Sequence, residues 1–337
     1  MGSEEMKVFE PYKIKDLELK NKVVMAPMCQ YSATDGYPND WHHVHYTTRA
    51  VGGVGFIVIE MTNVEPDGRI TDNCLGLWED GQIEAFKGIV DSVHAHGAKV
   101  SIQIAHAGRK ATDAETPVSA SDIRYSDKYK TPRALSTEEV YEMIEKFGQS
   151  ARRAIEAGVD SIEIHGAHGY LIHQFSSKRT NNRTDEFGED LSLFGRKVIE
   201  RVKEEIPEGM PLSIRMSAKE YATDGYDLSH GVYLAEQFKN AGVDFIHVSA
   251  GGEGQPDKAR LGTIGPGYMV PFAKEIREKV DIPVIAVGIL DDVKDAEAAL
   301  ESADLVALGR VLLRDPYWVA NHDDKHRFVA KQYERGY

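Results

Sequence analysis

The sequence predicts an α/β protein that folds as a single-domain (β/α)8 TIM barrel, and three observations predict it. First, short apolar segments typical of buried parallel strands alternate eight times with helical patterns along the 337 residues. Second, no linker or change of composition divides the chain. Third, the passage from helix end to strand repeats, since AGVDSIEIH at 157–165 resembles AGVDFIHVS at 241–249, with a weaker copy at 302–309. An open doubly wound sheet is the alternative, but no GxGxxG follows an early strand.

The expected strands are short and mostly apolar. Pro27 ends the first of them, because proline cannot donate to a central strand ladder. The strands are expected at 21–25, 54–60, 99–104, 161–165, 212–216, 244–249, 283–287 and 304–308. Two polar segments without periodicity, 112–135 and 176–190, are long loops, and such loops in a compact domain usually belong to a site or a lid.

Helical patterns lie between the strands. Asn39 or Asp40 is expected to cap the first helix, and Ser136 with Glu139 forms a capping box at the third. The helices are expected at 40–51, 81–96, 136–157, 193–205, 228–241, 268–280 and 293–302, with a short helical tail after Arg314.

Composition narrows the class of partner and the compartment. The 40 Lys and Arg against 54 Asp and Glu give a net charge of −14, which argues against nucleic acid or an anionic membrane as the main partner. Two cysteines, Cys29 and Cys74, are too few for a disulfide framework, and a zinc-type CxxC pair is absent. No apolar run is long enough to span a bilayer, and the acidic start MGSEEMK lacks the apolar region of a signal peptide. A cytoplasmic protein is therefore expected.

The residues that follow the strands are the candidate site, because the strand exits of a (β/α)8 barrel form its active site. The fourth strand releases His165, His168 and Tyr170 within six positions, with Gly166 and Gly169 between them. These three rings donate or accept hydrogen bonds or titrate, so they do not suit a hydrophobic core. Other polar or reactive residues at strand exits are Pro27, Met28, Cys29, Gln30, Tyr31, Glu60, Met61, Thr62, Gln103, His106, Lys110, Arg215, Ser249, Gly251, Gly252, Gly288, Gly309 and Arg310. Their concentration at one end of the barrel predicts an enzyme.

Glycines after the last three strands predict a phosphate-bearing ligand. Gly251, Gly288 and Gly309 leave backbone N–H groups open to an anion, and Arg310 adds a positive charge. The loops after the seventh and eighth strands are the usual phosphate site of this fold. The alternative is that these glycines only make tight turns.

The residues at these strand exits would also suit two other kinds of chemistry, metal binding and nucleophilic catalysis. His165 and His168 could bind a metal as an HxxH pair, but metal-dependent barrels usually add carboxylates, and Glu60 is the only acidic candidate, so no metal is predicted. Cys29 as a nucleophile would need a base within hydrogen-bond range. The alternative for Cys29, and the interpretation of Cys74, is a buried, unreactive thiol.

Several longer motifs occur in order at these strand exits, and together they carry a resemblance. They are APMCQYS at 26–32, QIAHAGRK at 103–110, HGAHGY at 165–170, NRTD at 182–185 and GR at 309–310. With them, residues 8–337 resemble the Old Yellow Enzyme family of FMN-dependent NADPH dehydrogenases and ene-reductases, and within it the thermophilic-like bacterial branch. The segments 176–180 and 187–192 depart from the runs common in the family, which leaves the substrate range open.

The resemblance implies one noncovalently bound FMN at the mouth of the barrel. Arg215 would lie beside the N1 and C2-carbonyl side of the flavin, where reduction builds up negative charge. The other implied cofactor-binding residues are Ala26, Pro27, Met28, Cys29, Met61 and Gln103 around the ring system, and Ser249, Gly251, Gly288, Gly309 and Arg310, the last three at the phosphate.

The resemblance also implies a ping-pong reaction. NADPH or NADH would reduce FMN, and the flavin N5 would then pass a hydride to the β-carbon of an α,β-unsaturated carbonyl compound. His165 and His168 would bind the carbonyl oxygen, and Tyr170, a phenol of ordinary pKa, would protonate the α-carbon. Tyr31 and Lys110 would line the substrate pocket. The alternatives are an FMN-containing NAD(P)H oxidase, a flavoprotein without turnover, and a metal-dependent lyase or hydrolase.

The C-terminal tail is implied to be an interface. Arg335, in the closing YERGY, matches an arginine that enters the neighbouring subunit's active site in this branch. Residues 1–337 would thus form one FMN-binding barrel, with the tail 319–337 at a subunit interface of a homodimer or homotetramer.

Overall fold

The computed structural model describes residues 5–337 and contains a closed barrel of parallel strands. In the order in which they pair, the barrel strands are β3 (Val23–Met25), β13 (Leu305–Leu308), β12 (Val284–Ala286), β11 (Phe245–Ser249), β10 (Leu212–Ser217), β9 (Ser161–Gly166), β6 (Lys99–Ala105) and β4 (Phe56–Asn63). The barrel closes because β3 also pairs with β4. The predicted (β/α)8 fold is confirmed.

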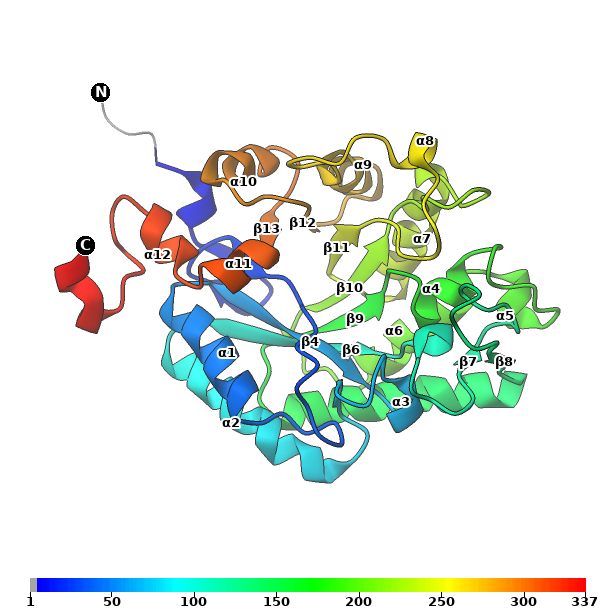
Figure 1. Ribbon diagram of the computed structural model, residues 1–337. Coiled ribbons are helices and arrows are strands. Elements are labelled where there is room, and N and C mark those ends of the chain that lie inside the picture. The colour runs from blue at the N-terminus through cyan, green and yellow to red at the C-terminus, as the bar shows by residue number, and fades with distance from the viewer. Residues whose placement is uncertain (1–4) are drawn as a thin grey trace.

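Helices surround the barrel (Figure 1). The main ones are α1 (Asp40–Val51), α2 (Ile83–Ala95), α3 (Thr137–Glu156), α6 (Leu193–Lys203), α7 (Leu228–Ala241), α9 (Val270–Val280) and α10 (Val293–Ala299), and the chain ends in α11 (Arg310–Arg314), α12 (Trp318–His322) and the 3-10 turn η5 (Lys331–Gly336). The two predicted caps are present. The Asn39 side chain accepts the Trp41 N–H, and Ser136 Oγ accepts the Glu139 N–H at 3.1 Å.

Alternation along the strands divides the core into two layers. Residues such as Ile102, Ile162 and Ile214 point outward and pack beneath the helices. Phe56 and Phe245 belong to a separate apolar cluster in the barrel interior, the inner cluster, which extends to Ala26 and Val287 at the strand exits. Strand residues alternate between faces. The polar residues that alternate with these isoleucines, such as Gln103, Glu163 and Arg215, therefore point into the barrel.

A hairpin that the sequence did not predict joins this inner cluster. It consists of β1 (Tyr12–Ile14) and β2 (Leu17–Leu19), and Leu17 and Leu19 bury their side chains in the inner cluster. Three-residue strands give no readable periodicity. The remaining short elements that were not predicted are η1 (Lys7–Phe9), η2 (Pro66–Gly68), β5 (Leu75–Gly76), η3 (Asp80–Gln82), η4 (Gly108–Lys110), β7 (Val118–Ser119), β8 (Arg133–Ala134), α4 (Leu171–Ser176), α5 (Glu186–Glu189) and α8 (Lys258–Leu261).

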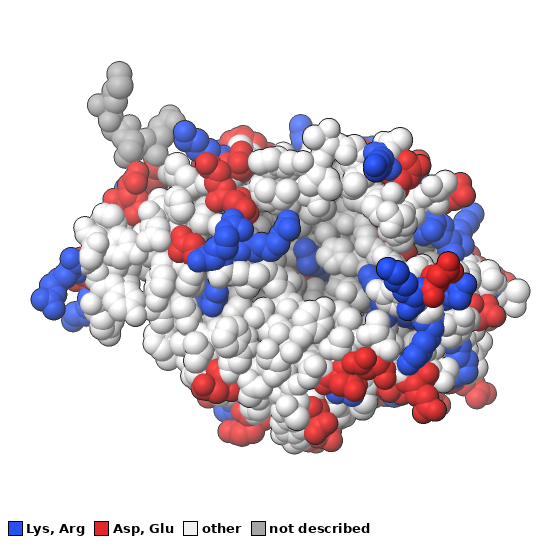
Figure 2. Space-filling view, in the orientation of Figure 1, with Lys and Arg blue, Asp and Glu red and all other residues white. Residues whose placement is uncertain are grey.

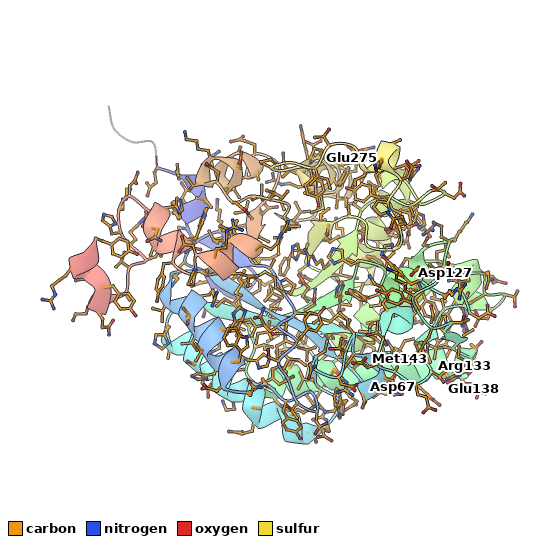
Figure 3. All side chains as sticks on the ribbon, in the orientation of Figure 1. Asp67, Asp127, Arg133, Glu138, Met143 and Glu275 are labelled. Carbon is orange, nitrogen blue, oxygen red and sulfur yellow. The ribbon has the colours of Figure 1, made fainter. Side chains whose placement is uncertain are left out.

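The two long polar segments are packed together and are not free loops. The Asn182 N–H donates to Ser121 Oγ at 2.9 Å, and Arg183 donates to the carbonyl of Ala120 at 3.0 Å. Asp127 and Arg133, both in the first segment, lie at the outer edge of the molecule (Figure 3). The described part of the chain has no helix of the length and apolarity that crossing a membrane requires.

Two helical glycines give a matched test of the packing. A Cβ on Gly231 in α7 would lie 1.9 Å from the carbonyl oxygen of Ala218, whereas a Cβ on the exposed Gly88 in α2 would meet nothing within 4 Å. Gly231→Ala should therefore lower the free energy of unfolding by about 1–3 kcal/mol through overpacking. Gly88→Ala should raise it by about 0.5–1 kcal/mol, because alanine loses less backbone entropy on folding. Urea unfolding of both variants checks the pair, and shifts of the same sign would contradict the packing described for α7.

Candidate active site

The three rings predicted to form the site lie together at the exit of β9. The His165 ring centroid is 5.5 Å from that of His168, with the rings nearly perpendicular, and 4.9 Å from that of Tyr170. The turn after β9 is tight. His168 has a φ of +60°, Gly169 has a φ of +73°, and a Cβ on Gly169 would lie 2.5 Å from the carbonyl oxygen of Gly252. Only glycine fits that close approach.

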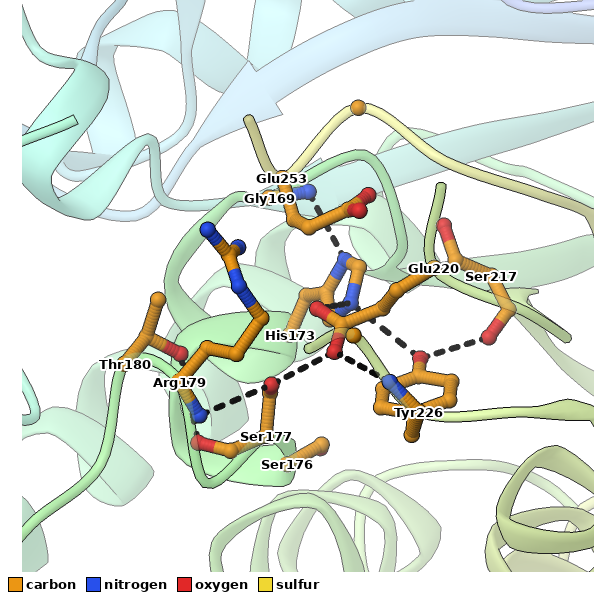
Figure 4. A network of polar contacts seen from close by, with 12 residues as sticks. Gly169, His173, Ser176, Ser177, Arg179, Thr180, Ser217, Glu220, Tyr226 and Glu253 are labelled. Atoms are coloured by element: carbon orange, nitrogen blue, oxygen red, sulfur yellow. Dashed lines mark hydrogen bonds and ion pairs between the residues drawn. The ribbon is translucent and has the colours of Figure 1, made fainter. Parts of the chain in front are cut away.

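A network of buried polar contacts holds this turn from behind (Figure 4). The Gly169 N–H donates to His173 Nδ1 at 2.8 Å, so His173 carries its proton on Nε2. That Nε2 lies 3.2 Å from a carboxylate oxygen of the buried Glu220. The His168 N–H in turn donates to Ser217 Oγ at 3.0 Å. The left-handed backbone of the turn is therefore fixed from α4 and from β10.

The two imidazoles of the site are neutral. Burial, and next the positive charge of Arg215, hold the pKa of His165 and His168 well below the usual range. The Ala167 N–H donates to His165 Nδ1 at 3.2 Å, which leaves Nε2–H as the donor of that ring. His168 Nε2 shares a 2.6 Å hydrogen bond with Ser249 Oγ. A neutral imidazole N–H can polarise a carbonyl oxygen without delivering a full proton, and the ring nitrogens left for this contact are Nε2 of His165 and Nδ1 of His168.

Tyr170 is a phenol protected from ionisation. Burial raises its pKa above the ordinary value, so the expectation of an ordinary phenol pKa was wrong. The ammonium of Lys110 lies 4.5 Å from the Tyr170 ring centroid and 4.8 Å from that of Tyr125. No sequence pattern indicated Tyr125, because this residue lies inside the aperiodic segment 112–135.

Lys110 is engaged by the protein itself. Its Nζ donates to the carbonyl oxygens of His168 at 2.9 Å and Gly252 at 3.1 Å. Burial, and next the charge of Arg109, lower the pKa of Lys110 to about 8. In this structure the lysine thus ties the β9 turn to the loop after β11.

A cavity of about 220 Å³ lies at the exits of β3, β10, β12 and β13. Seven of the predicted cofactor residues line it: Ala26, Pro27, Met28, Arg215, Gly288, Gly309 and Arg310. Tyr268 and Met269 also line it and were not predicted. Figure 2 shows this face of the molecule hollowed at its centre, with Lys and Arg side chains at the rim. A larger cavity of about 740 Å³ lies beside the C-terminal tail, and none of the predicted site residues lines it.

Two buried polar atoms near this cavity lack a partner within the described residues. They are Nε of Arg215 and Nε2 of His247. Leaving such a buried donor or acceptor unpaired costs about 1–3 kcal/mol. An anionic ligand that carries both hydrogen-bond donors and acceptors would satisfy them.

The other predicted cofactor residues do not line this cavity. Met61 lies in a small apolar cluster that Cys29 and Tyr170 pack against. Gln103 donates to Glu163 inside the barrel at 2.8 Å. Gly251 is left-handed, with a φ of +72°, and Ser249 Oγ is held by His168 as described.

The two cysteines affect each other's ionisation. Cys74 is buried, but the Cys29 thiol, and then Thr71 through its N–H at 3.5 Å, stabilise the Cys74 thiolate and lower its pKa. The same contact, together with burial, raises the pKa of Cys29. Cys29 is therefore a thiol at neutral pH, which does not suit a nucleophile.

Glu60 does not face the two histidines of the site. Its carboxylate accepts the Gln30 N–H and the Tyr46 hydroxyl, each at 2.7 Å, and burial raises its pKa to about 7. Among residues 5–337, no three His, Cys, Asp or Glu side chains are placed so that they could hold a metal ion.

Tyr31 and Arg335 are exposed. Tyr31 follows the exit of β3 with a φ of +50°, and 47% of its surface is accessible. Arg335 lies in η5, where with Tyr317, Tyr333 and Tyr337 it lines a cavity of about 540 Å³. The tail ends on the side of α12, away from β9 (Figure 1). Within one chain the structure does not bring Arg335 to the other predicted site residues.

Comparison with known proteins assigns the class that this fold and site define, the FMN-binding oxidoreductases built on a (β/α)8 barrel. Residues 7–327 match the NADH:flavin oxidoreductase / NADH oxidase family. The NADPH dehydrogenase of Bacillus subtilis (strain 168) is 43% identical over 98% of this chain and 99% of its own length.

Solved structures agree with this assignment. Morphinone reductase has a TM-score of 0.80 at 29% identity, covering 96% of this chain and 90% of its own. The old yellow enzyme homologue of Zymomonas mobilis has a TM-score of 0.81 at 26% identity, covering 95% and 93%. The chain belongs to the NADH:flavin oxidoreductase / NADH oxidase family, and the resemblance to the Old Yellow Enzyme family is confirmed.

Family membership confirms that the protein is an oxidoreductase with FMN as cofactor and a nicotinamide nucleotide as donor. The residues at the strand exits fit this cofactor. The unpaired Arg215 and His247 atoms suit a polar, anionic ring system. Gly288 and Gly309 border the same cavity as Arg310, where a phosphate group could approach the backbone.

Proposed function

We propose that the protein uses NADPH or NADH to reduce the carbon–carbon double bond of α,β-unsaturated carbonyl compounds, the enones and enals. The observation that carries the proposal is the meeting of two neutral imidazoles with one buried phenol at the exit of β9. The names of the relatives, NADPH dehydrogenase among them, support a small-molecule oxidoreductase.

In this proposal His165 and His168 are the electrophilic part of the site. FMN supplies the hydride when it is bound and reduced. The imidazole N–H groups donate to the substrate's carbonyl oxygen and draw electron density from its β-carbon, so that they stabilise the negative charge that develops on the oxygen. Because both rings are neutral, they do so without competing to protonate the substrate.

Tyr170 is the acid that completes the reduction by protonating the α-carbon. Its hydroxyl stays protonated at neutral pH because burial disfavours the phenolate. Lys110 fixes the ring from one side, and Tyr31 and Tyr125 are proposed as walls of the substrate pocket, with Lys110 at its edge.

The cofactor site follows from the cavity and its surroundings. Arg215 would balance the negative charge of the reduced ring system, and Gln103 would contact the same ring system from the interior of the barrel. The other residues proposed to hold FMN are Ala26, Pro27, Met28, Cys29 and Met61 at the ring, Ser249 and Gly251 beside it, and Gly288, Gly309 and Arg310 at the phosphate.

Cofactor release and product formation test this function. Denaturing the purified protein should release about one FMN per chain, and anaerobic NADPH oxidation should require cyclohexenone and yield cyclohexanone. Protein that holds no flavin, or that oxidises NADPH only with oxygen, would overturn the ene-reductase proposal, and the second result would favour the NAD(P)H oxidase alternative.

The C-terminal tail is proposed as part of a subunit interface, in a homodimer or homotetramer where Arg335 reaches the neighbouring site. Support comes from the exposed Tyr333 and Tyr337 on either side of it, with 46% and 45% of their surfaces accessible. Tyrosine and arginine are enriched at protein interfaces.

Substitution of Arg335 tests the role of the tail. Arg335→Ala should raise the KM for cyclohexenone about tenfold, the loss of one hydrogen bond to a substrate, with FMN per chain unchanged. Lys331→Ala, on the same exposed turn, is the control. An unchanged KM in the Arg335 variant, or a monomeric wild-type protein by light scattering, would refute this role.

A further inference from the structure

One buried carboxylate inside the barrel has no part in the reaction proposed above. Glu163 lies in the middle of β9, with 1% of its surface accessible. Oε2 accepts a hydrogen bond from Gln103 Nε2 at 2.8 Å, and Oε1 lies 2.9 Å from His247 Nδ1. The three side chains come from β9, β6 and β11, so that Glu163 connects non-adjacent strands across the interior.

These two contacts fix the hydrogen-bonding direction of both partners. The Gln103 amide must present Nε2 to the carboxylate, which turns its carbonyl oxygen away as a free acceptor. Burial, and next the charge of Arg215, lower the pKa of His247, so the ring is neutral and donates from Nδ1. Its Nε2 is then an acceptor, and it is one of the buried atoms that lack a partner within the described residues. Glu163 therefore determines which atoms face the ligand.

Glu163 also balances the charge of Arg215. Arg215 follows Glu163 at the next level of the barrel, since it pairs with His165 on β9 and with His247 on β11. Burial lowers the pKa of Arg215, and Glu163 is the only carboxylate among the groups that oppose this shift. The guanidinium that would face reduced FMN is thus already partly neutralised from below.

We propose that Glu163 is a positioning residue that sets the reduction potential of bound FMN, acting through Gln103, His247 and Arg215. This inference rests on the proposed function, because it takes Gln103 and Arg215 as contacts of the flavin. A fixed negative charge disfavours the negative charge that FMN gains on reduction, because like charges repel each other more strongly in the protein interior than in water. Glu163 should therefore hold the potential low.

Removal of this charge in the holoenzyme tests the proposal. In Glu163→Gln the two-electron equilibrium with a reference dye should shift at least tenfold toward reduced flavin, or about 30 mV. Glu163→Asp keeps the negative charge, so its reduction potential should change by less than half of the change, in millivolts, that Glu163→Gln produces. Glu65→Gln is the matched control. Glu65 also accepts two hydrogen bonds, from His106 at 2.7 Å and Lys146 at 2.6 Å, but does not contact Gln103, and its variant should keep the wild-type potential.

A second variant has an expected effect of opposite sign. His247→Leu removes a donor from Glu163, leaves the carboxylate less screened, and should shift the equilibrium about threefold toward oxidised flavin. If Glu163→Gln does not retain FMN, the His247→Leu variant alone tests the role of Glu163. A shift below twofold in Glu163→Gln with FMN bound, or a shift toward reduced flavin in His247→Leu, would overturn the role of Glu163. A wild-type protein without flavin would instead refute the proposed function.

Discussion

Replacing His165 and His168 together with alanine should lower the turnover of cyclohexenone at least about 100-fold, because one lost donor to a developing oxyanion already costs that much. FMN content should not change, since neither ring lines the cavity at the exits of β3, β10, β12 and β13. Flavin reduction by NADPH should fall, but less than enone turnover.

The control for the histidine variant is His43→Ala, which removes an exposed imidazole from α1. Its enone turnover and FMN content should equal those of the wild type. Steady-state assays with FMN quantified after denaturation give both readouts. Turnover of the double variant within fivefold of the wild type would remove His165 and His168 from the mechanism.

Tyr170→Phe should slow the reoxidation of reduced enzyme by cyclohexenone by a factor of about 100 to 10,000, the usual contribution of a positioned general acid. The change deletes only the hydroxyl. The phenyl ring keeps its place beneath the Lys110 ammonium, so the β9 turn should hold its shape. The preceding reduction by NADPH needs no proton from this hydroxyl and should keep its rate.

Stopped-flow absorbance separates the two half-reactions of the Tyr170 variant. Tyr233→Phe, which deletes an exposed hydroxyl on α7, serves as the control and should reoxidise at the wild-type rate. If both half-reactions of Tyr170→Phe kept their rates, a different group would have to supply the proton.

The main elements could be predicted because they are long or buried on both faces. Helices α1 and α7 begin and end at the predicted residues, 40–51 and 228–241, because Asn39 caps the start of α1 and the left-handed Gly242 follows the end of α7. The β1–β2 hairpin could not be predicted, because its strands have three residues each and only their contacts with the inner cluster stabilise them.

In the candidate site, the residues that are close in sequence could be predicted, and the contacts between distant residues could not. His165, His168 and Tyr170 are close in sequence, so a strand exit is enough to bring them together. Glu163 and His247 are 84 positions apart and meet only because the barrel closes, so their contact leaves no local pattern in the sequence.

The central claim, that this flavoprotein reduces enones, is tested most directly by anaerobic sequential mixing of the purified protein. NADPH should bleach the flavin absorbance, and cyclohexenone added afterwards should restore it while one equivalent of cyclohexanone forms. Flavin that stays bleached with the enone and regains its colour only with oxygen would contradict the claim.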